Sequence, residues 1–194
     1  MSRVKELESQ LDSTERQLRL VQKISRLMVR EGSLSKVLDK VVSLVVEFMH
    51  SDSCLIYLMQ DRELVLCAAH DPQPKTIGQV RLKLGEGLTG WVAREKRFLA
   101  ISREAYADPR FKLFKDLPED TYEAFLSAPI VMRGRVMGVI NVQHEETHTH
   151  SGGEMELLTT VGEQLGCLVA LASVDRESLE KQDSLEAALA PARK

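Results

Sequence analysis

The chain has 194 residues and a mass of 21.8 kDa, and its 26 basic and 29 acidic residues give a net charge of −3 at neutral pH. Apolar residues make up 43% and charged residues 28%, as in soluble globular proteins, which argues against fibrous and intrinsically disordered classes. The charge balance also argues against a dedicated nucleic-acid binder, which needs a strongly basic surface. Without an apolar run of about 20 residues or an apolar signal segment, the sequence predicts a cytoplasmic protein with no membrane contact.

The chain has three cysteines, which are Cys54, Cys67 and Cys167. Their odd number, their wide spacing and the absence of a C-x-x-C pair predict reduced, buried thiols rather than a disulfide framework or a cysteine-rich zinc site.

The first 32 residues carry a heptad pattern that predicts a coiled-coil-like helix. Its seam positions are Val4, Leu7, Leu11, Thr14, Leu18, Val21, Ser25 and Met28. Leu20, Ile24 and Leu27 widen the apolar face in the later turns. Such a seam needs a partner helix, either from a second copy or from the same chain. We expect a dimer contact that includes Leu7, Leu11, Leu18 and Val21.

A second helix is expected to begin at Ser33, because Gly32 interrupts the pattern and serine is a good N-cap. Apolar runs at 54–59 and 64–69 then predict a hairpin of buried strands. Residues 80–84 alternate apolar and basic side chains, which predicts a strand with one wet face.

The turn Gly85-Glu-Gly87 precedes a predicted short helix over residues 88–96, followed by a strand at 98–101 and an irregular stretch at 102–123. Residues 124–132 and 136–142 predict a second tight hairpin. The Ser-x-x-Glu pattern of Ser151 and Glu154 predicts a capping box that opens a long last helix. Leu168 and Leu171 of that helix complete the expected dimer interface.

This order of elements predicts an α+β fold with an antiparallel sheet and helices on one face, because short hairpin links join only antiparallel strands. We divide the chain into an N-terminal helix (1–32), a central domain (33–173) and a C-terminal helical extension or linker (174–194).

Four motifs in this order resemble the GAF domain family. They are Gly85-Glu-Gly-Leu-Thr-Gly-Trp-Val-Ala93, Asp108-Pro-Arg-Phe111, Phe125-Leu-Ser-Ala-Pro-Ile130 and Arg133-Gly-Arg-Val-Met-Gly-Val-Ile-Asn-Val-Gln143. They are most similar to the GAF domains of bacterial nitrogen-fixation activators and of nitrogen-branch phosphotransferase enzyme I. The resemblance covers residues 34–172 and implies a six-stranded antiparallel sheet, a loop-roofed ligand pocket and dimerisation through the terminal helices. It implies a sensory or regulatory module.

We expect the pocket between the sheet and the segment 81–125. Its predicted lining combines aromatic, apolar and a few polar side chains, as small-molecule sites do: Arg81, Trp91, Ile101, Ser102, Ala105, Tyr106, Phe111, Tyr122, Phe125, Ser127 and Asn141. Residues 81–116 hold nine basic and five acidic side chains. This excess suits an anionic ligand, and a scattered solvated surface explains it equally well. The sequence names neither ligand nor cofactor.

Enzymatic activity is not expected. The GAF proteins that reduce free methionine-R-sulfoxide need a thiolate in the glycine-rich turn, and Gly87-Leu-Thr-Gly90 contains no cysteine. The residue set of cyclic-nucleotide GAF domains is also incomplete, although Asn141 is kept.

His144, His148 and His150, with Glu145 and Glu146, form a possible metal-ligand cluster. We favour the simpler interpretation, a polar, solvated loop before the last helix, and predict no metal.

The functional hypothesis is therefore a homodimeric sensory module that binds a small ligand and signals through its terminal helices to an output domain or partner. One alternative is a dimerisation scaffold with a vestigial pocket. Another is the truncated input domain of a GAF-ANTAR RNA-binding antiterminator, suggested by residues 184–194. We expect no direct nucleic-acid binding by this segment itself.

Overall fold

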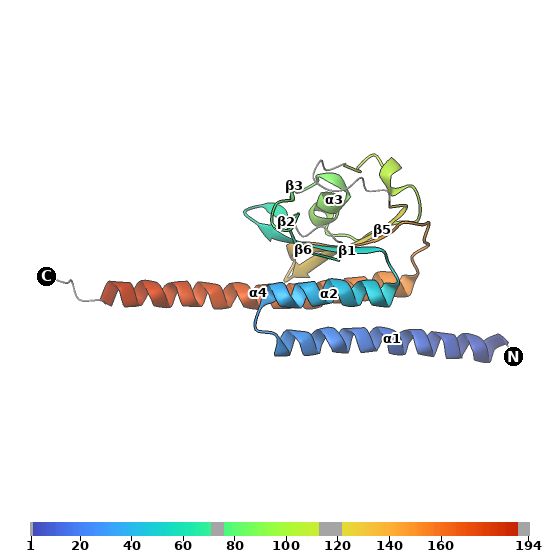
Figure 1. Cartoon of the computed structure of the whole chain (residues 1–194), viewed down its shortest axis with the longest axis horizontal. Helices are drawn as coiled ribbons and strands as arrows, with labels where there is room; N and C mark the ends of the chain where they lie inside the picture. The colour runs from blue at the N-terminus through green and yellow to red at the C-terminus, as the bar shows by residue number, and fades with distance from the viewer. Residues whose placement is uncertain (1, 71–75, 113–121, 190–194) are drawn as a thin grey trace.

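The computed structural model describes residues 2–70, 76–112 and 122–189 (Figure 1). Its elements in chain order are α1 (Ser2–Arg30), α2 (Leu34–Met49), β1 (Ser53–Gln60), β2 (Glu63–His70), β3 (Arg81–Lys83), α3 (Gly87–Glu95), β4 (Leu99–Ile101), the 3-10 turn η1 (Ala105–Ala107), β5 (Ala124–Met132), β6 (Arg135–His144) and α4 (Gly152–Leu189). The strands form one six-stranded sheet in the order β3-β2-β1-β6-β5-β4, and all neighbours are antiparallel. The predicted α+β fold is confirmed.

Both predicted hairpins are present, and their turns explain why they form. Asp61 and Arg62 join β1 to β2 with φ angles of 48° and 71°, and Arg133 and Gly134 join β5 to β6 with φ angles of 48° and 74°. Two successive positive φ angles match the right-handed twist of antiparallel strands. The two hairpins then meet through β1 and β6 at the centre of the sheet.

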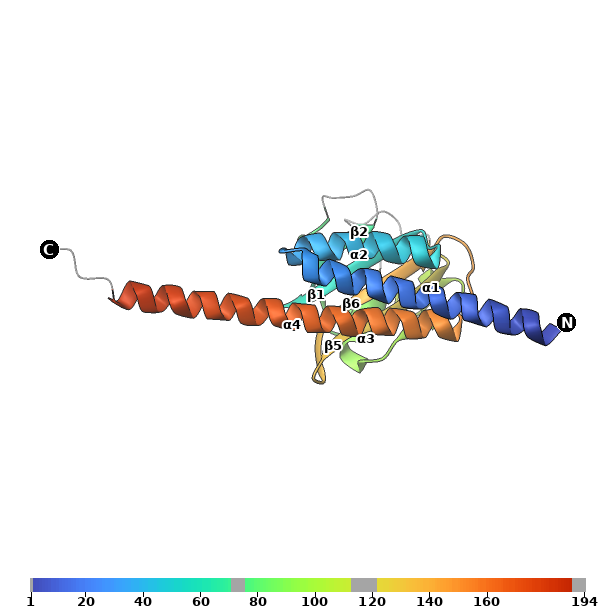
Figure 2. The same cartoon turned by 90° about the horizontal axis from the view of Figure 1, so that it is seen from below.

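Helices α2 and α4 cover one face of the sheet, and α1 packs against both of them on the side away from the sheet (Figures 1 and 2). Leu20 and Ile24 of α1 are fully buried in this core. Helix α4 approaches β5 closely at two glycines. A Cβ atom on Gly162 would lie 2.9 Å from the Pro129 carbonyl oxygen, and one on Gly166 would lie 2.5 Å from that of Val131. Only glycine permits this approach.

The start of α4 is the predicted capping box. The Glu154 amide donates to Ser151 Oγ at 3.2 Å, and Glu154 Oε2 accepts from the Ser151 amide at 2.7 Å. Ser33 takes the N-cap position of α2 as expected, but its side chain makes no capping hydrogen bond.

The stretch Gly152–Ser173 of α4 is long and apolar enough to cross a membrane by length and composition, which the search for apolar runs missed. Its apolar stripe, which includes Leu158, Val161 and Leu165, belongs to the core against the sheet. A core helix passes the same test.

The structure divides the expected dimer seam. Val4, Leu7, Leu11 and Leu18 of α1 and Leu171 of α4 are each more than half exposed. In contrast, Val21 and Leu168 pack partly buried against the core of their own chain. The exposed part of the seam therefore lies mainly in the N-terminal half of α1.

Candidate functional site

The opposite face of the sheet carries α3, positioned by the glycine-rich turn. Gly87 has a φ of 66°, and a Cβ atom on Gly90 would lie 2.5 Å from the Lys83 carbonyl oxygen. Glu86 accepts a hydrogen bond from the Lys83 amide at 2.7 Å and pairs with Lys112. The Lys112 ammonium, followed by the Lys83 amide, holds the pKa of Glu86 below its usual value. These contacts hold the start of α3 close to the end of β3.

A buried polar network ties α3 to the centre of the sheet. Ser127 Oγ donates to Asn141 Oδ1 at 2.7 Å, and Asn141 Nδ2 donates to Thr89 Oγ1 at 2.8 Å. All three side chains are buried. Two of the predicted pocket residues thus bind each other and α3.

The strand register places a second row of side chains beside this network. Across β1, β6, β5 and β4, the row consists of Ser53, Gln143, Phe125 and Ile101. Because side chains alternate along a strand, this row shares the α3 face with Leu55, Phe125 and Val139 of the second core cluster. Ser53 Oγ and Gln143 Oε1 are buried without hydrogen-bond partners in the described part of the chain. Such groups are costly unless something binds them.

Part of the expected roof is fastened over α3. Arg110 donates to both carboxylate oxygens of Asp108, at 2.8 and 2.7 Å, and its guanidinium lies 4.5 Å from the centre of the Trp91 ring. The hydrogen bond from Arg110 holds the pKa of Asp108 below its usual value. Trp91, Ile101 and Phe111 are half-buried against the second core cluster. Residues 113–121 of the predicted roof lie outside the described residues.

The other predicted pocket residues occupy different surroundings. Ala105 is buried, and its amide donates to the Glu123 carbonyl oxygen at 3.0 Å. Tyr106 is exposed beside the Glu123 carboxylate, which raises the pKa of its hydroxyl. Ser102 is exposed and Tyr122 half-buried.

Arg81 lies apart from the other predicted residues. It pairs with Glu63 at 3.7 Å and borders a groove formed with α2, β1 and β2. Its neighbour Leu82 points to the α3 face, so alternation along β3 turns Arg81 to the opposite face.

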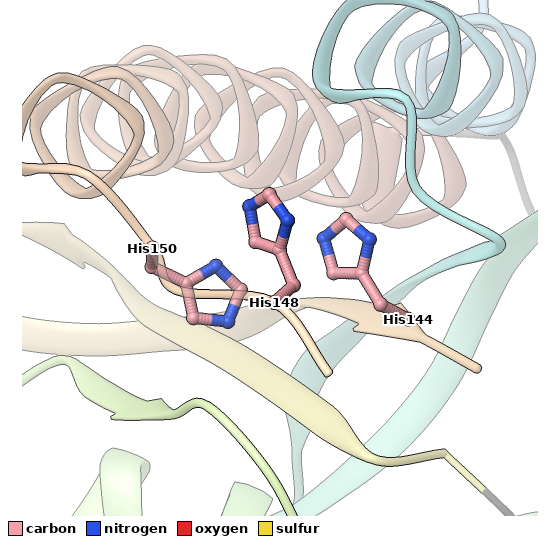
Figure 3. A group of neighbouring side chains, drawn as sticks. All are labelled: His144, His148 and His150. Atoms are coloured by element: carbon pink, nitrogen blue, oxygen red, sulfur yellow. The ribbon is translucent and has the colours of Figure 1, made fainter. Parts of the chain in front are cut away.

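A second group of polar side chains gathers where β6 leads into α4 (Figure 3). The rings of His144 and His148 are stacked with centroids 4.1 Å apart, and His150 lies 4.9 Å from His148. His144 and His150 are buried, and His148 is half-buried. The predicted solvated loop is therefore wrong for His144 and His150, which point inward, whereas Glu145 and Glu146 are exposed as predicted.

Burial is the largest influence on the protonation of His144 and His150. It lowers the pKa of His150 to about 4, with the neighbouring His148 adding to the effect, while the Glu154 carboxylate and the Ile101 backbone oppose it only in part. Burial, and then His148, also lowers the pKa of His144. The imidazoles of His144 and His150 are thus favoured in their neutral form.

The cysteines lie outside both sites. Cys54 is buried in the core between the sheet and the helices, and burial raises the pKa of its thiol. Cys67 is half-buried, with its pKa raised for the same reason, and Cys167 is exposed on α4. The described turn Gly85–Gly90 holds no thiol.

Residues 33–169 match the profile of the GAF domain family. The chain belongs to the GAF family. It is similar to the solved GAF domain of a phosphoenolpyruvate-protein phosphotransferase from Coxiella burnetii, with a TM-score of 0.79 and 27% identity, covering 84% of this chain and 98% of that one. This confirms the GAF fold inferred from the motifs.

Two proteins with similar sequences are much longer than the region that matches this chain. The phosphoenolpyruvate-dependent phosphotransferase system protein of Salmonella typhimurium is 28% identical over 143 residues, which cover 73% of this chain and 19% of that protein. The Nif-specific regulatory protein of Herbaspirillum seropedicae is 26% identical over 172 residues, covering 84% of this chain and 31% of that protein. The chain therefore spans less than a third of either relative.

Sequence analysis missed three polar residues of this GAF domain. Thr89 completes the Asn141 network, and Ser53 and Gln143 form the unpaired part of the next row. Alternation from Asn141 along β6 would have indicated the face of Gln143. Ser53 gave no such signal, because its position opposite Gln143 depends on pairing across 90 residues of chain.

Proposed function

We propose that this GAF domain is a non-catalytic sensory module that binds a small molecule on the α3 face of its sheet and signals through its terminal helices. The domain belongs to a regulatory family, and similar domains occur in phosphotransferase and Nif regulatory proteins. The observation that carries the ligand proposal is the pair of unpaired polar groups, Ser53 Oγ and Gln143 Oε1, in a buried row. A non-catalytic role agrees with the burial of Cys54 and the absence of a thiol from the glycine-rich turn.

The row suits a ligand with an apolar body and a polar edge. Phe125 and Ile101 supply apolar surface, and Ser53 and Gln143 follow in the same row across the sheet. The Gln143 carboxamide oxygen accepts a hydrogen bond, and the Ser53 hydroxyl both donates and accepts. Small-molecule sites commonly combine apolar walls with a few polar groups of this kind.

The same region is linked to the start of α4. The His148 amide donates to the Ser102 carbonyl oxygen at 3.0 Å, which joins the segment after β4 to the loop before α4. Gln143 itself lies one residue from the end of β6. A ligand that orders this edge of the sheet can shift the packing of α4 if it prefers one helix arrangement.

The output is proposed to be a homodimer formed through α1. Val4, Leu7, Leu11 and Leu18 form an exposed apolar stripe with coiled-coil spacing. The same segment of a second copy would cover this stripe.

Light scattering of the chain carrying both Leu11→Glu and Leu18→Glu tests the dimer. We expect a dimer mass for the unaltered protein and a monomer mass for the double variant. Gln10→Glu with Gln22→Glu is the matched control, because it adds two acidic groups to α1 at exposed polar positions and should leave the dimer intact. A monomeric unaltered protein, or an unchanged mass in the leucine variant, contradicts the dimer.

Native mass spectrometry of freshly purified protein, followed by denaturing spectra, tests the ligand. A defined mass that is retained by the native protein, released on denaturation and lost in Gln143→Met supports the sensor. Gln79→Met, at an exposed position, should keep it. If no mass is retained and a panel of nucleotides and metabolites leaves the melting temperature unchanged, the dimerisation scaffold replaces the sensor.

A further inference from the structure

We propose that His144, His148 and His150 form a binding site for a divalent transition-metal ion of the Zn²⁺ type at the junction of β6 and α4. The three side chains come from the last residue of β6 and the short loop before α4. One potential ligand atom from each lies within 4.8 Å of the others. Figure 3 shows the three rings drawn together there. Three imidazoles are an established zinc ligand set.

The hydrogen bonds of the cluster point to a missing partner. His144 Nε2 and both ring nitrogens of His150 are buried without a hydrogen-bond partner of normal geometry among the described residues. Leaving such groups unpaired destabilises the folded protein. A metal ion would bind one nitrogen of each ring.

The nitrogen of His148 that faces the ion follows from its other contact. His148 Nε2 lies 2.8 Å from Glu154 Oε1, which leaves Nδ1 as the ligand. A carboxylate on the second ring nitrogen is the usual way in which proteins orient a metal-binding histidine. Glu154 is itself held by the Ser151 amide and hydroxyl, both at 2.7 Å. The capping box of α4 therefore also fixes the carboxylate that positions His148.

Metal binding requires a small rearrangement of the rings. In a tetrahedral zinc site with bonds of about 2.0–2.1 Å, ligand atoms are about 3.3 Å apart. In the structure the potential ligand atoms lie up to 4.8 Å apart, and the His144 ring is stacked on the His148 ring. The rings must therefore turn toward a common centre to bind the ion. The loop before α4 carries two of the three histidines, so the shift involves this short segment.

A cation can reach the cluster from solvent. His144 and His148 line a depression whose rim carries the acidic residues Asp52, Glu145 and Glu146. On its other side, His148 and Glu154 line a second depression against α1 and the end of α2. Imidazole nitrogens with carboxylates around them favour a divalent cation over an anion.

Zinc titration of the untagged full chain, stripped with a chelator, tests the site. We expect one Zn²⁺ per chain by calorimetry and metal analysis, and a higher melting temperature with bound metal. His150→Ala and, separately, His148→Ala should weaken binding at least about 100-fold, because each removes a ligand. Glu154→Gln should weaken it about 10- to 100-fold, because it loosens the positioning of His148.

His70→Ala is the matched control, since His70 lies exposed on β2 away from the cluster, and should bind like the unaltered protein. Circular dichroism identifies any variant that fails to fold. His148→Ala is the variant least expected to disturb folding, because the His148 side chain is only half-buried. Co²⁺ used in place of Zn²⁺ should show a tetrahedral visible spectrum that disappears in His148→Ala. Failure of the unaltered chain to bind Zn²⁺, or binding by both histidine variants that is as tight as that of the unaltered chain, would overturn the proposal. Neither result tests the small molecule proposed to bind at Gln143. That proposal is tested by native mass spectrometry, through the mass that the protein retains.

Discussion

Two buried polar clusters in this GAF domain differ in whether their polar groups are hydrogen-bonded. In the first, Thr89, Ser127 and Asn141 hydrogen-bond to one another and fasten α3 to the sheet. In the second, His144 and His150 are buried with ring nitrogens that have no partner in the described part of the chain. A buried polar group contributes to stability when it is paired and costs stability when it is not. The first cluster therefore stabilises the fold through its hydrogen bonds. The second cluster is the place where we propose that a metal ion binds.

The largest expected effect comes from breaking the paired cluster. Asn141→Leu removes the central amide and leaves the Ser127 and Thr89 hydroxyls unpaired, so we expect a loss of about 2–4 kcal/mol in the free energy of unfolding. Urea denaturation measures it. Gln143→Leu is the matched control two residues along the same face of β6. It removes an unpaired group and should cost less than about 1 kcal/mol. Equal losses for the two variants would erase the distinction between paired and unpaired positions.

Thr89→Val should have the next largest effect. It keeps the shape of the side chain but leaves Asn141 Nδ2 without its acceptor, and we expect a loss of about 1–2 kcal/mol by urea denaturation. Thr160→Val is the control, because the Thr160 hydroxyl donates to the Glu156 carbonyl oxygen of its own helix and so ties no other element to the sheet among the described residues. A loss no greater than that of the control would mean that the Thr89 hydrogen bond contributes nothing to stability.

A smaller loss of stability is expected at the capping box, where Ser151 holds the Glu154 carboxylate that contacts His148. Ser151→Ala removes the hydroxyl that caps α4 and holds Glu154, and we expect a loss of about 1 kcal/mol in thermal or urea unfolding. Ser151→Thr should retain most of the stability. If alanine and threonine behave alike, the hydroxyl is not the stabilising group.

The smallest effect is expected at the unpaired histidine. With a chelator present, His150→Leu should leave the unfolding free energy within about 1 kcal/mol of the unaltered protein, because it removes ring nitrogens that are buried without a partner of normal geometry among the described residues. In excess Zn²⁺ the same variant should melt lower than the unaltered protein, which alone gains from metal binding. Destabilisation of several kcal/mol without metal would show that His150 is a structural residue.

Much of the fold was predictable because its signals are local. The left-handed turns after Gln60 and Met132 and the capping box at Ser151 each occupy a few neighbouring residues, and the heptad seam repeats within one continuous helix. The glycine at position 90 marked the turn that seats α3. Local signals of this kind survive in a single sequence because they do not depend on which distant segment packs nearby.

The candidate site was only partly predictable. Phe125, Ile101 and Trp91 lie on the α3 side as expected, but Arg81 turns to the opposite face. That difference arises because Leu82, rather than Arg81, takes the inward position in a strand of three residues. A single step of register moves a side chain across the sheet, and the sequence pattern of so short a strand does not determine the step.

By itself, the amino-acid sequence determined the elements, their antiparallel order and the family, since turn chemistry, periodicity and motif order are properties of the chain. Only the tertiary structure decided which polar side chains are paired. It set Ser53 beside Gln143 through the pairing of β1 with β6, and it folded the loop of His148 and His150 inward against Glu154. Burial and hydrogen bonding depend on what packs against a residue from elsewhere in the chain. The sequence therefore indicated the histidines as a cluster, and their burial next to Glu154 is the basis on which we propose a metal site.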